Sequence, residues 1–421
     1  MSKALQVPND WKPAKIKDVA QINPRSNSVD DDTLVTFLPM NAVSESGIIQ
    51  GDEIRKAIDV KNGFTSFESG DVLVAKITPC FENYKGCLCK ELKNDRGYGS
   101  TEFHVLRPKK SITGEYLHIL TRTHHFRGTG ELNMTGTAGQ KRVPAIFLEN
   151  YEFQLPPLPE QKAIAALLST WDEATEKTEK LIQAKERWLR RTMQSLLFGH
   201  SRIGGSKRNS IEGHFFNYPA DWMYKEIGSV AHEVSFRNGN KHEIVLSCSK
   251  HSGFVNSLDY FGKKVFSHDT SNYKVIKRDQ FGYPSNHIEE GSIGLLEHCD
   301  KGIVSPIYVV FEVDQDVVCP NYLFMLLKTS IYKHIFRVST SSSVDRRGSL
   351  RWGEFSKIKI LIPPLEEQIK IVETVLDLKN EITFLCQLAE RYRVQKRGLM
   401  QKLLTGEWRV KPDIVNQYME A

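Results

Sequence analysis

Two stretches of the chain, residues 156–199 and 363–406, space their apolar residues alternately by four and three positions. This heptad spacing is typical of long α-helices that pair as coiled coils. A proline pair opens each stretch and Gly199 or Gly406 closes it, as expected for the beginning and the end of a helix. The pattern therefore predicts two helices of about 40 residues, each about 60 Å long at ~1.5 Å per residue.

The apolar positions form one seam along each predicted helix. Lys396 alone interrupts the second seam, whereas three threonines and Lys185 dilute the first. A helix this long with one apolar face needs a partner, and the nearest candidate is the other helix. The alternative is that each helix packs only on its own domain. The predicted seam residues are Leu168, Trp171, Ile182, Leu189 and Leu196 in the first helix, and Ile371, Val375, Leu378, Ile382, Leu385, Leu399 and Leu403 in the second.

The chain repeats itself. LPPLPEQKAI at 155–164 recurs as IPPLEEQIKI at 362–371, a shift of 207 positions (363 − 156). The same shift carries QSLLFG at 194–199 onto QKLLTG at 401–406, so neither copy has an insertion between these points. Weaker matches lie upstream at shifts between 205 and 211. The sequence is therefore a tandem duplication, in which the helices kept their length and the other parts diverged.

The parts that precede the helices consist of short apolar runs separated by Gly, Asn, Asp and Pro, a pattern typical of β-strands. A short helix is predicted at 115–124 in the first part and at 320–334 in the second. The predicted fold is α+β: two globular domains separated by two long antiparallel coiled-coil helices, with pseudo-two-fold symmetry from the duplication. The predicted division is a first domain at 1–155, a first helix at 156–199, a polar linker at 200–213, a second domain at 214–362, a second helix at 363–406 and a tail at 407–421.

Composition adds little beyond these patterns. A chain of 421 residues suits two or more domains, and its formal charge of +6 permits a nucleic-acid partner without requiring one. No apolar run approaches the ~18 residues of a membrane span, and the first residues do not resemble a signal peptide. Together with seven scattered cysteines, an odd number, these observations predict a reduced, cytoplasmic location and no membrane association.

Motifs for chemistry are not found. The sequence contains no GxxxxGK[ST] loop, no Asn/Asp-Pro-Pro-Tyr/Phe tetrapeptide, no GxGxxG after a strand and no HExxH. Cys80, Cys87 and Cys89 suggest a zinc site, but a fourth ligand is lacking nearby, and buried thiols are the alternative. We therefore predict no catalytic residue, no metal and no cofactor on this chain itself.

Each globular part carries two loops rich in hydrogen-bond donors, at 76–86 and 135–142 in the first part and at 283–292 and 339–352 in the second. Arg and Lys suit guanine edges and phosphates, and Asn and Gln suit adenine. The alternative for any one loop is a simple solvated turn. The candidate DNA-binding residues are Lys76, Thr78, Asn83, Lys85, Thr135, Gln140, Lys141, Arg142, Ser285, Asn286, Ser342, Arg346, Arg347 and Arg351.

The sequence resembles the specificity (S) subunit of a Type I restriction–modification system. The resemblance rests on PPLPEQ and PPLEEQ at the helix starts, LLFG and LLTG at the helix ends, GDVLVAKITP at 70–79 and GIVSPIYVVF at 302–311. In that family a target-recognition domain is followed by a spacer helix, and the pair is repeated. The resemblance implies that each domain reads one half of a bipartite double-stranded DNA target, with a fixed non-specific spacer between the halves.

The resemblance also implies partners. Two methyltransferase (M) subunits and two restriction/translocase (R) subunits would assemble on the chain, and S-adenosylmethionine, ATP and Mg²⁺ would belong to them. One alternative is the specificity chain of a Type IIB-like or orphan methyltransferase system. The other is a duplicated scaffold that binds no DNA. Among the loop residues, Arg142 and Arg347 are expected to contact bases or phosphates.

Overall fold

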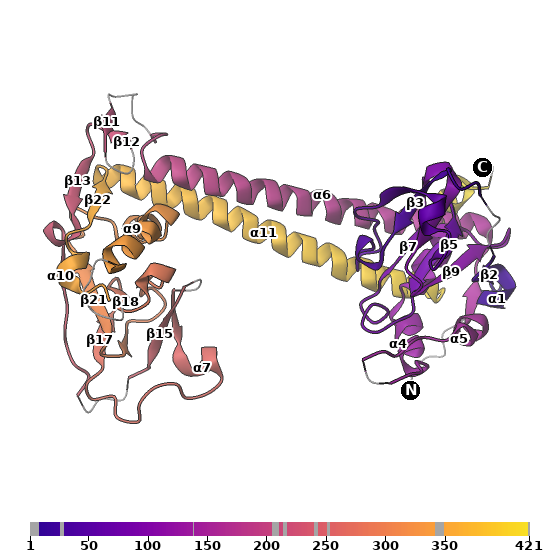
Figure 1. Ribbon diagram of the computed structural model, residues 1–421, viewed down its shortest axis with the longest axis horizontal. Coiled ribbons are helices and arrows are strands. Elements are labelled where there is room, and N and C mark those ends of the chain that lie inside the picture. Colours follow the sequence, from indigo (N-terminus) through magenta and orange to yellow (C-terminus); the bar gives the residue numbers. More distant parts are fainter. Residues whose placement is uncertain are drawn as a thin grey trace. The chain divides into compact units, whose positions relative to one another are not determined.

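The computed structural model describes residues 8–25, 29–137, 139–203, 210–213, 217–239, 243–250, 253–341 and 349–419 (Figure 1). The chain divides into two compact units: unit 1 comprises Met1–Glu179 with Gln387–Ala421, and unit 2 comprises Lys180–Cys386. Both long helices pass through both units. Each unit therefore contains a globular part and a segment of each helix.

Unit 1 combines two four-stranded sheets with three helices that follow them in sequence. The strand orders are β2-β9-β6-β7 and β4-β3-β8-β5, and β1 pairs separately with β10. All these pairings are antiparallel except that of β3 with β8. The elements are β1 (Lys12–Lys15), α1 (Ile16–Val19), β2 (Ala20–Ile22), β3 (Leu34–Leu38), η1 (Met40–Ala42), β4 (Glu53–Lys56), α2 (Ala57–Val60), β5 (Thr65–Glu68), β6 (Val72–Ala75), β7 (Gly86–Leu88), η2 (Lys93–Asp95), β8 (Arg96–Gly99), β9 (Phe103–Pro108), α3 (Gly114–Thr121), α4 (His124–Leu132), α5 (Ala145–Asn150) and β10 (Glu152–Leu155).

Strand β6 is the centre of unit 1, because both of its faces are buried. Val72 and Val74 pack in the cluster that includes α3, α4 and α5, whereas Leu73 and Ala75 pack in the cluster between the two sheets. All four side chains are fully buried. Alternation along a strand sends successive side chains to opposite faces, so this uninterrupted apolar run suits a strand covered on both sides.

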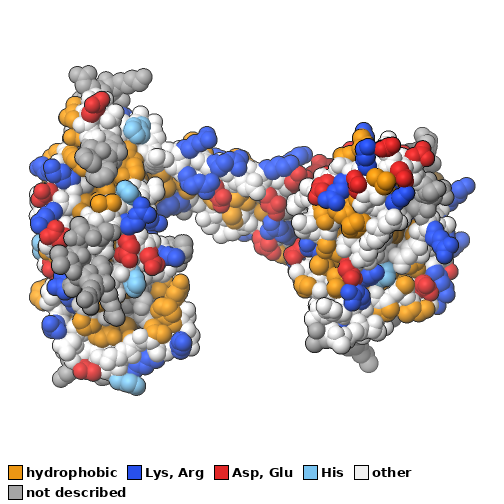
Figure 2. All heavy atoms as spheres, in the orientation of Figure 1, with side chains coloured by type: hydrophobic (Ala, Val, Ile, Leu, Met, Phe, Trp, Pro, Cys, Tyr) orange, Lys and Arg blue, Asp and Glu red, His pale blue; other side chains and the backbone are white. Residues whose placement is uncertain are grey.

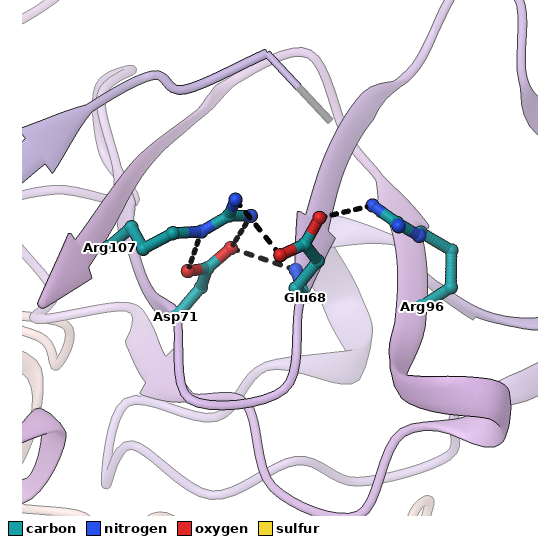
Figure 3. Close-up of polar contacts among 4 residues, drawn as sticks. All are labelled: Glu68, Asp71, Arg96 and Arg107. Carbon is teal, nitrogen blue, oxygen red and sulfur yellow. Dashed lines mark hydrogen bonds and ion pairs between the residues drawn. The ribbon is translucent and has the colours of Figure 1, made fainter. Parts of the chain in front are cut away.

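An ion-pair cluster joins the two sheets at the start of β6 (Figure 3). Arg107 on β9 forms two 2.8 Å hydrogen bonds with Asp71 and a 2.9 Å ion pair with Glu68. Glu68 ends β5 and also pairs with Arg96 on β8 at 2.5 Å. A cavity of about 340 Å³ lies beside this cluster. The Gly70-Asp71 dipeptide therefore has a structural role, which is to fix the beginning of β6.

Unit 2 repeats this arrangement around one four-stranded sheet. Its order is β14-β21-β18-β19, and β13–β22, β15–β16 and β17–β20 are further antiparallel pairs. The elements are β11 (Ser210–Glu212), β12 (Asn217–Pro219), β13 (Met223–Glu226), η3 (Ile227–Ser229), β14 (Ala231–Glu233), β15 (Leu246–Ser249), β16 (Gly253–Asn256), α7 (Ser257–Phe261), β17 (Lys274–Lys277), β18 (Phe281–Pro284), η4 (Ile288–Glu290), β19 (Gly294–Leu295), β20 (Lys301–Val304), β21 (Tyr308–Val313), α8 (Pro320–Leu327), α9 (Ser330–Ser341), α10 (Trp352–Phe355) and β22 (Lys359–Ile362).

The two units share the order of their central four-stranded sheets, β2-β9-β6-β7 and β14-β21-β18-β19. In unit 2, Gln280 before β18 and Glu312 on β21 are joined by a 2.7 Å hydrogen bond, in the places of Asp71 and Arg107. The predictions of a single short helix in each part were incomplete. α3 is followed by α4 after the cap Thr123, and α8 is followed by α9 beyond Thr329, whose hydroxyl accepts a hydrogen bond from the Tyr332 amide.

Helices α6 (Leu158–Leu197) and α11 (Leu365–Leu404) run antiparallel, which confirms the predicted fold class (Figure 1). In unit 1, Trp171 packs edge-on against Tyr392 with a 5.7 Å centroid separation, and Lys396 forms a 2.5 Å ion pair with Asp172. In unit 2, Lys185 forms a 2.7 Å ion pair with Glu381. The helices therefore contact one another as well as their own domains. The alternative of helices that pack only on their own domains is thereby excluded.

The helix positions nearest the seam are the least exposed. On α11, Ile371, Val375, Ala389 and Leu403 are buried, and the other heptad positions between them are partly buried in a helix whose remaining residues are mostly exposed. On α6 the ends of the seam, Leu168 and Leu196, are buried. Trp171, Ile182, Leu189, Leu378, Ile382, Leu385 and Leu399 are all partly buried.

The repeated glutamine at each helix start attaches the helix to its domain. Gln161 and Gln368 are both fully buried. The Gln161 amide donates to the carbonyls of Ser111 and Pro156 at 3.0 and 2.9 Å and accepts from the Thr113 amide at 3.0 Å. Gln368 forms the same three types of bond in unit 2. Because a buried amide needs all its partners, glutamine is required at this position.

The helix ends attach to the domain of the other copy. Arg202, which follows α6, binds Glu367 through Nε at 2.6 Å and Asp221 through Nη1 at 2.9 Å. The Trp222 indole N–H also donates to Glu367, at 3.2 Å. A Cβ on Gly199 would lie 2.3 Å from Pro219 Cδ, so glycine is needed where the chain turns into this contact.

Unit 1 contains the equivalent joint, and the duplication shift of 207 carries Arg202 to Arg409 (409 − 202). Arg409 binds Glu160 at 2.5 Å and Asp10 at 2.8 Å, and the Trp11 indole donates to Glu160 at 2.9 Å. The hydrogen bonds from Arg409 lower the pKa of Asp10. Each copy therefore provides the arginine that closes the domain of the other copy.

Candidate nucleic-acid interface

The two predicted recognition loops of unit 1 lie side by side where β6 ends. Ile77 and Arg142 form an isolated antiparallel bridge. The Thr78 amide donates to the Lys141 carbonyl at 3.0 Å, and the Val143 amide donates to the Lys76 carbonyl at 2.8 Å. Segments separated by more than 50 residues in the sequence therefore form one surface.

The predicted residues of this surface differ in their exposure and in their hydrogen-bond partners. Thr135, Gln140 and Lys141 are exposed, and Lys76 and Thr78 are partly buried. At the far end of the first loop, the Asn83 amide donates to Glu45 at 3.0 Å and the Lys85 ammonium donates to the Met40 carbonyl at 3.3 Å. The structure brings five of these residues together with Arg142, namely Lys76, Thr78, Thr135, Gln140 and Lys141. The side chains of Asn83 and Lys85 instead form hydrogen bonds within the protein.

Arg142 is oriented by a residue that the sequence did not indicate. Its guanidinium forms hydrogen bonds of 2.9 and 2.8 Å to the two carboxylate oxygens of Glu102, which lies before β9. These bonds lower the pKa of Glu102 and raise the pKa of Arg142, so both groups are charged near neutral pH. The Arg142 side chain is still 43% exposed, so a guanidinium held in one direction remains accessible.

A buried histidine forms a hydrogen bond with the backbone of the same surface. His104 is buried on β9, and its Nε2 lies 2.8 Å from the Val143 carbonyl, next to Arg142. Its Nδ1 lies 3.1 Å from the amide nitrogen of Asn23, which can only donate. Burial lowers the pKa of His104, so the ring is neutral near pH 7 and donates through Nε2. Neither Glu102 nor His104 belongs to a recognisable sequence motif.

In unit 2 the equivalent loops also meet. The Leu350 amide donates to the Ser285 carbonyl at 2.8 Å, which places the exposed Arg351 beside the first loop. Ser285 is buried and Asn286 partly buried, so these two side chains are less accessible than expected for direct readout. Ser342, Arg346 and Arg347 lie outside the described residues. All the candidate DNA contacts in both units stay predictions.

The described part of the chain contains no cluster of three or more His, Cys, Asp or Glu side chains that could hold a metal ion. Cys87 and Cys89 are buried on β7 and just after it, and burial raises the pKa of the Cys89 thiol. Among the described residues, no helix is both long and apolar enough to cross a membrane. On the face shown in Figure 2, Lys and Arg side chains alternate with Asp and Glu over the globular part of unit 1.

Comparison with known proteins identifies the same two copies. The family model described as "Type I restriction modification DNA specificity domain" matches residues 8–186 and again 219–390. The EcoAI specificity subunit of Escherichia coli is 43% identical over 166 residues, which cover 38% of this chain and 28% of that protein. The EcoEI specificity subunit, also from E. coli, is 41% identical over 169 residues and matched over 28% of its length. The chain thus matches less than a third of these two relatives.

Other relatives are matched over most of their length. The EcoKI specificity subunit of E. coli K12 is 22% identical, with 92% of this chain and 82% of that protein aligned. The crystal structure of the HsdS subunit from Thermoanaerobacter tengcongensis has a TM-score of 0.54 and 16% identity, and covers 96% of this chain and 98% of its own. At that identity the likeness concerns the fold. Because the family model matches most of both copies, the chain belongs to the family of the Type I restriction modification DNA specificity domain.

Proposed function

We propose that this chain is the sequence-specific DNA-recognition subunit of a Type I restriction–modification complex, in which each unit reads one half of a bipartite target. The observation that carries the proposal is the double family match, together with a composite loop surface at the same place in both units. Loops placed on a rigid sheet can vary without altering the core. Two diverged surfaces on conserved frameworks suit two different half-sites.

The chemistry of the unit 1 surface suits duplex DNA. Arg142, held by Glu102, offers a guanidinium in fixed orientation, which suits a guanine edge or a phosphate. Gln140 and Lys141 lie exposed beside it and can contact adenine edges and phosphates. Losing a base contact here would cost about 1–3 kcal/mol at one position, whereas losing a phosphate contact would weaken binding to all sequences alike.

Catalysis in this account belongs to partner subunits. Two methyltransferase subunits and two restriction/translocase subunits would assemble on the chain and would bind S-adenosylmethionine, ATP and Mg²⁺. The chain would act in the cytoplasm, where the DNA is. A Type IIB-like or orphan methyltransferase system would use the same recognition chain with other partners. We favour Type I because the relatives named above are Type I specificity subunits. A duplicated scaffold without DNA binding has no observation in its favour.

The proposed function is tested by measuring DNA binding and methyl transfer with the purified chain, with and without a methyltransferase subunit. We expect the complex to bind duplex DNA with an affinity that falls steeply with salt, about a thousandfold between 50 and 200 mM for six or more phosphate contacts. The chain alone should transfer no labelled methyl group, and the methyltransferase alone serves as the control. Methyl transfer by the chain alone, or binding by the complex that depends on neither salt nor sequence, would contradict the proposal.

A further inference from the structure

Arg122 and Lys328 occupy equivalent places in the two units. A shift of 206 carries Tyr116 on α3 to Tyr322 on α8 (322 − 116), and the same shift carries Arg122 to Lys328 (328 − 122). Each of these two residues is the C-cap of its helix, directly after α3 or α8. A cation at the C-terminus of a helix is favoured by the helix dipole, but that alone does not explain where the two side chains reach.

The Arg122 guanidinium binds main-chain carbonyl groups of two separate loops. Its Nη1 donates to the Tyr84 carbonyl at 2.9 Å, and its Nη2 donates to the Glu45 carbonyl at 2.7 Å. Tyr84 lies in the first recognition loop, residues 76–86, whereas Glu45 lies between η1 and β4. Burial lowers the pKa of Arg122, so the protein keeps this cation in a poorly solvated place.

The Lys328 ammonium does the same in unit 2. It donates to the carbonyls of Gly291 and Lys250 at 2.9 Å each and lies 3.4 Å from that of Ile293. Gly291 belongs to the recognition loop 283–292, and Lys250 follows β15, outside that loop. Burial lowers the pKa of Lys328 as well. Both cations therefore link the end of a recognition loop to a second, unrelated loop.

A second pair of cations lies against the same loops at the same shift of 206 (333 − 127). Arg127 is buried and donates to the Phe81 carbonyl at 3.0 Å. Lys333 packs on Gly291 so closely that a Cβ there would lie 2.5 Å from Lys333 Cε. Both units have thus kept two cations against the recognition loop, although the loop sequences and the type of cation differ.

We propose that Arg122 and Lys328 are equivalent positioning residues for DNA readout, each of which holds the backbone of its unit's recognition loop in one conformation through main-chain carbonyls. The inference rests on the proposed function. Charge-assisted hydrogen bonds to carbonyls are stronger than neutral ones, and they leave the loop's side chains free to vary. A cation at this position can therefore support recognition loops of different sequence.

The test uses the complete chain in complex with its methyltransferase subunit and compares Arg122→Met, Lys328→Met and the wild type. The quantity measured is discrimination, the ratio of affinity for the cognate duplex to that for duplexes with one altered base pair. We expect Arg122→Met to lower discrimination about tenfold within the first half-site and to leave the second half-site unchanged. Lys328→Met should show the reverse. The salt slope should stay as in the wild type, because both cations are engaged with main-chain carbonyls and are not expected to bind phosphates.

Matched controls are the exposed lysines of the same units, tested as Lys110→Met and Lys263→Met. These should leave discrimination in both half-sites unchanged. If Arg122→Met does not fold, Arg122→Lys decides, because it keeps the positive charge but loses the two separate guanidinium nitrogens that bind the Tyr84 and Glu45 carbonyls. We expect from it a smaller loss that is still confined to the first half-site.

Unchanged discrimination in folded variants, or an equal loss in both half-sites, would overturn the inference. The first result would mean that the loops hold their conformation without these cations, and the second that the substitutions act on the whole fold. A wild-type complex without any sequence preference would instead overturn the proposed function. The two failures are therefore distinguishable in one set of measurements.

Discussion

A chain whose residues 1–155 are replaced by the first domain of another family member is expected to direct methylation to a target with one new half and one unchanged half. The globular part of unit 1 has its own sheets and a core cluster that lies wholly within residues 1–155, and the recognition loops 76–86 and 135–142 also belong to it. The original recognition of the first half-site should be lost completely, because every predicted contact in that half is exchanged. Mapping methylated adenines in DNA from cells with the hybrid complex measures the outcome.

The design of this domain exchange must preserve the contacts between the domain and the helix joint. The incoming domain must carry aspartate and tryptophan at the places of Asp10 and Trp11, because these residues bind Arg409 and Glu160 at the helix joint. A control hybrid that replaces only the loops should alter the same half-site. If the domain hybrid changed both halves of the target, or neither, the assignment of one half-site to each unit would be wrong.

The second large effect is expected from Arg202→Ala, which should lower the free energy of unfolding of unit 2 by about 3–5 kcal/mol. The Arg202 side chain is 12% exposed and that of Glu367 is 8% exposed, so the substitution leaves a buried carboxylate without its cation. Urea unfolding followed by tryptophan fluorescence measures the loss. The second substitution Glu367→Gln in the same chain should recover part of it, since the uncompensated charge is then removed.

The equivalent joint of unit 1 provides the matched comparison. The Arg409 side chain is 42% exposed and its partner Asp10 is 50% exposed, although Glu160 is only 2% exposed. Water can replace part of the hydrogen bonding by Arg409. Arg409→Ala should therefore lower the free energy of unfolding less than Arg202→Ala does. Equal losses, or a larger loss at Arg409, would show that burial of the pair does not decide its contribution.

Some of this architecture could be predicted because it repeats. The heptad positions and the PPLPEQ and PPLEEQ motifs recur at one fixed shift, so they indicated two long helices and their starts. Arg202 and Arg409 have the same shift of 207 and could have been found in the same way (409 − 202). The two arginines of the helix joints could therefore have been found from the sequence. That each arginine binds the domain of the other copy could not.

Other features could not be predicted, for physical reasons that particular residues show. Helix α4 carries Gly128 and Gly130, which are poor helix formers, but a Cβ on Gly130 would lie 2.4 Å from Phe81. Tertiary packing therefore overrides the local preference. Glu102 is 40 residues from Arg142, and only the fold brings them together. Arg122 and Lys328 bind carbonyl groups, which every residue has, so their partners leave no trace in the sequence.

We propose that this one chain reads two half-sites whose separation is set by α6 and α11. The most direct measurement is methylation of a duplex library in which the sequence and the spacer length both vary. It compares the wild-type complex with one carrying an extra heptad after Glu179 and after Glu390, which keeps the seam in register. Each insertion adds about 10.5 Å of helix, or about three base pairs.

For the wild type, we expect two short sequence blocks at one constant gap. For the lengthened complex, we expect the same two blocks at a gap about three base pairs longer, with weaker methylation because those base pairs also rotate the DNA by about a third of a turn. One continuous block for the wild type, or an active lengthened complex that keeps the original gap, would contradict the claim.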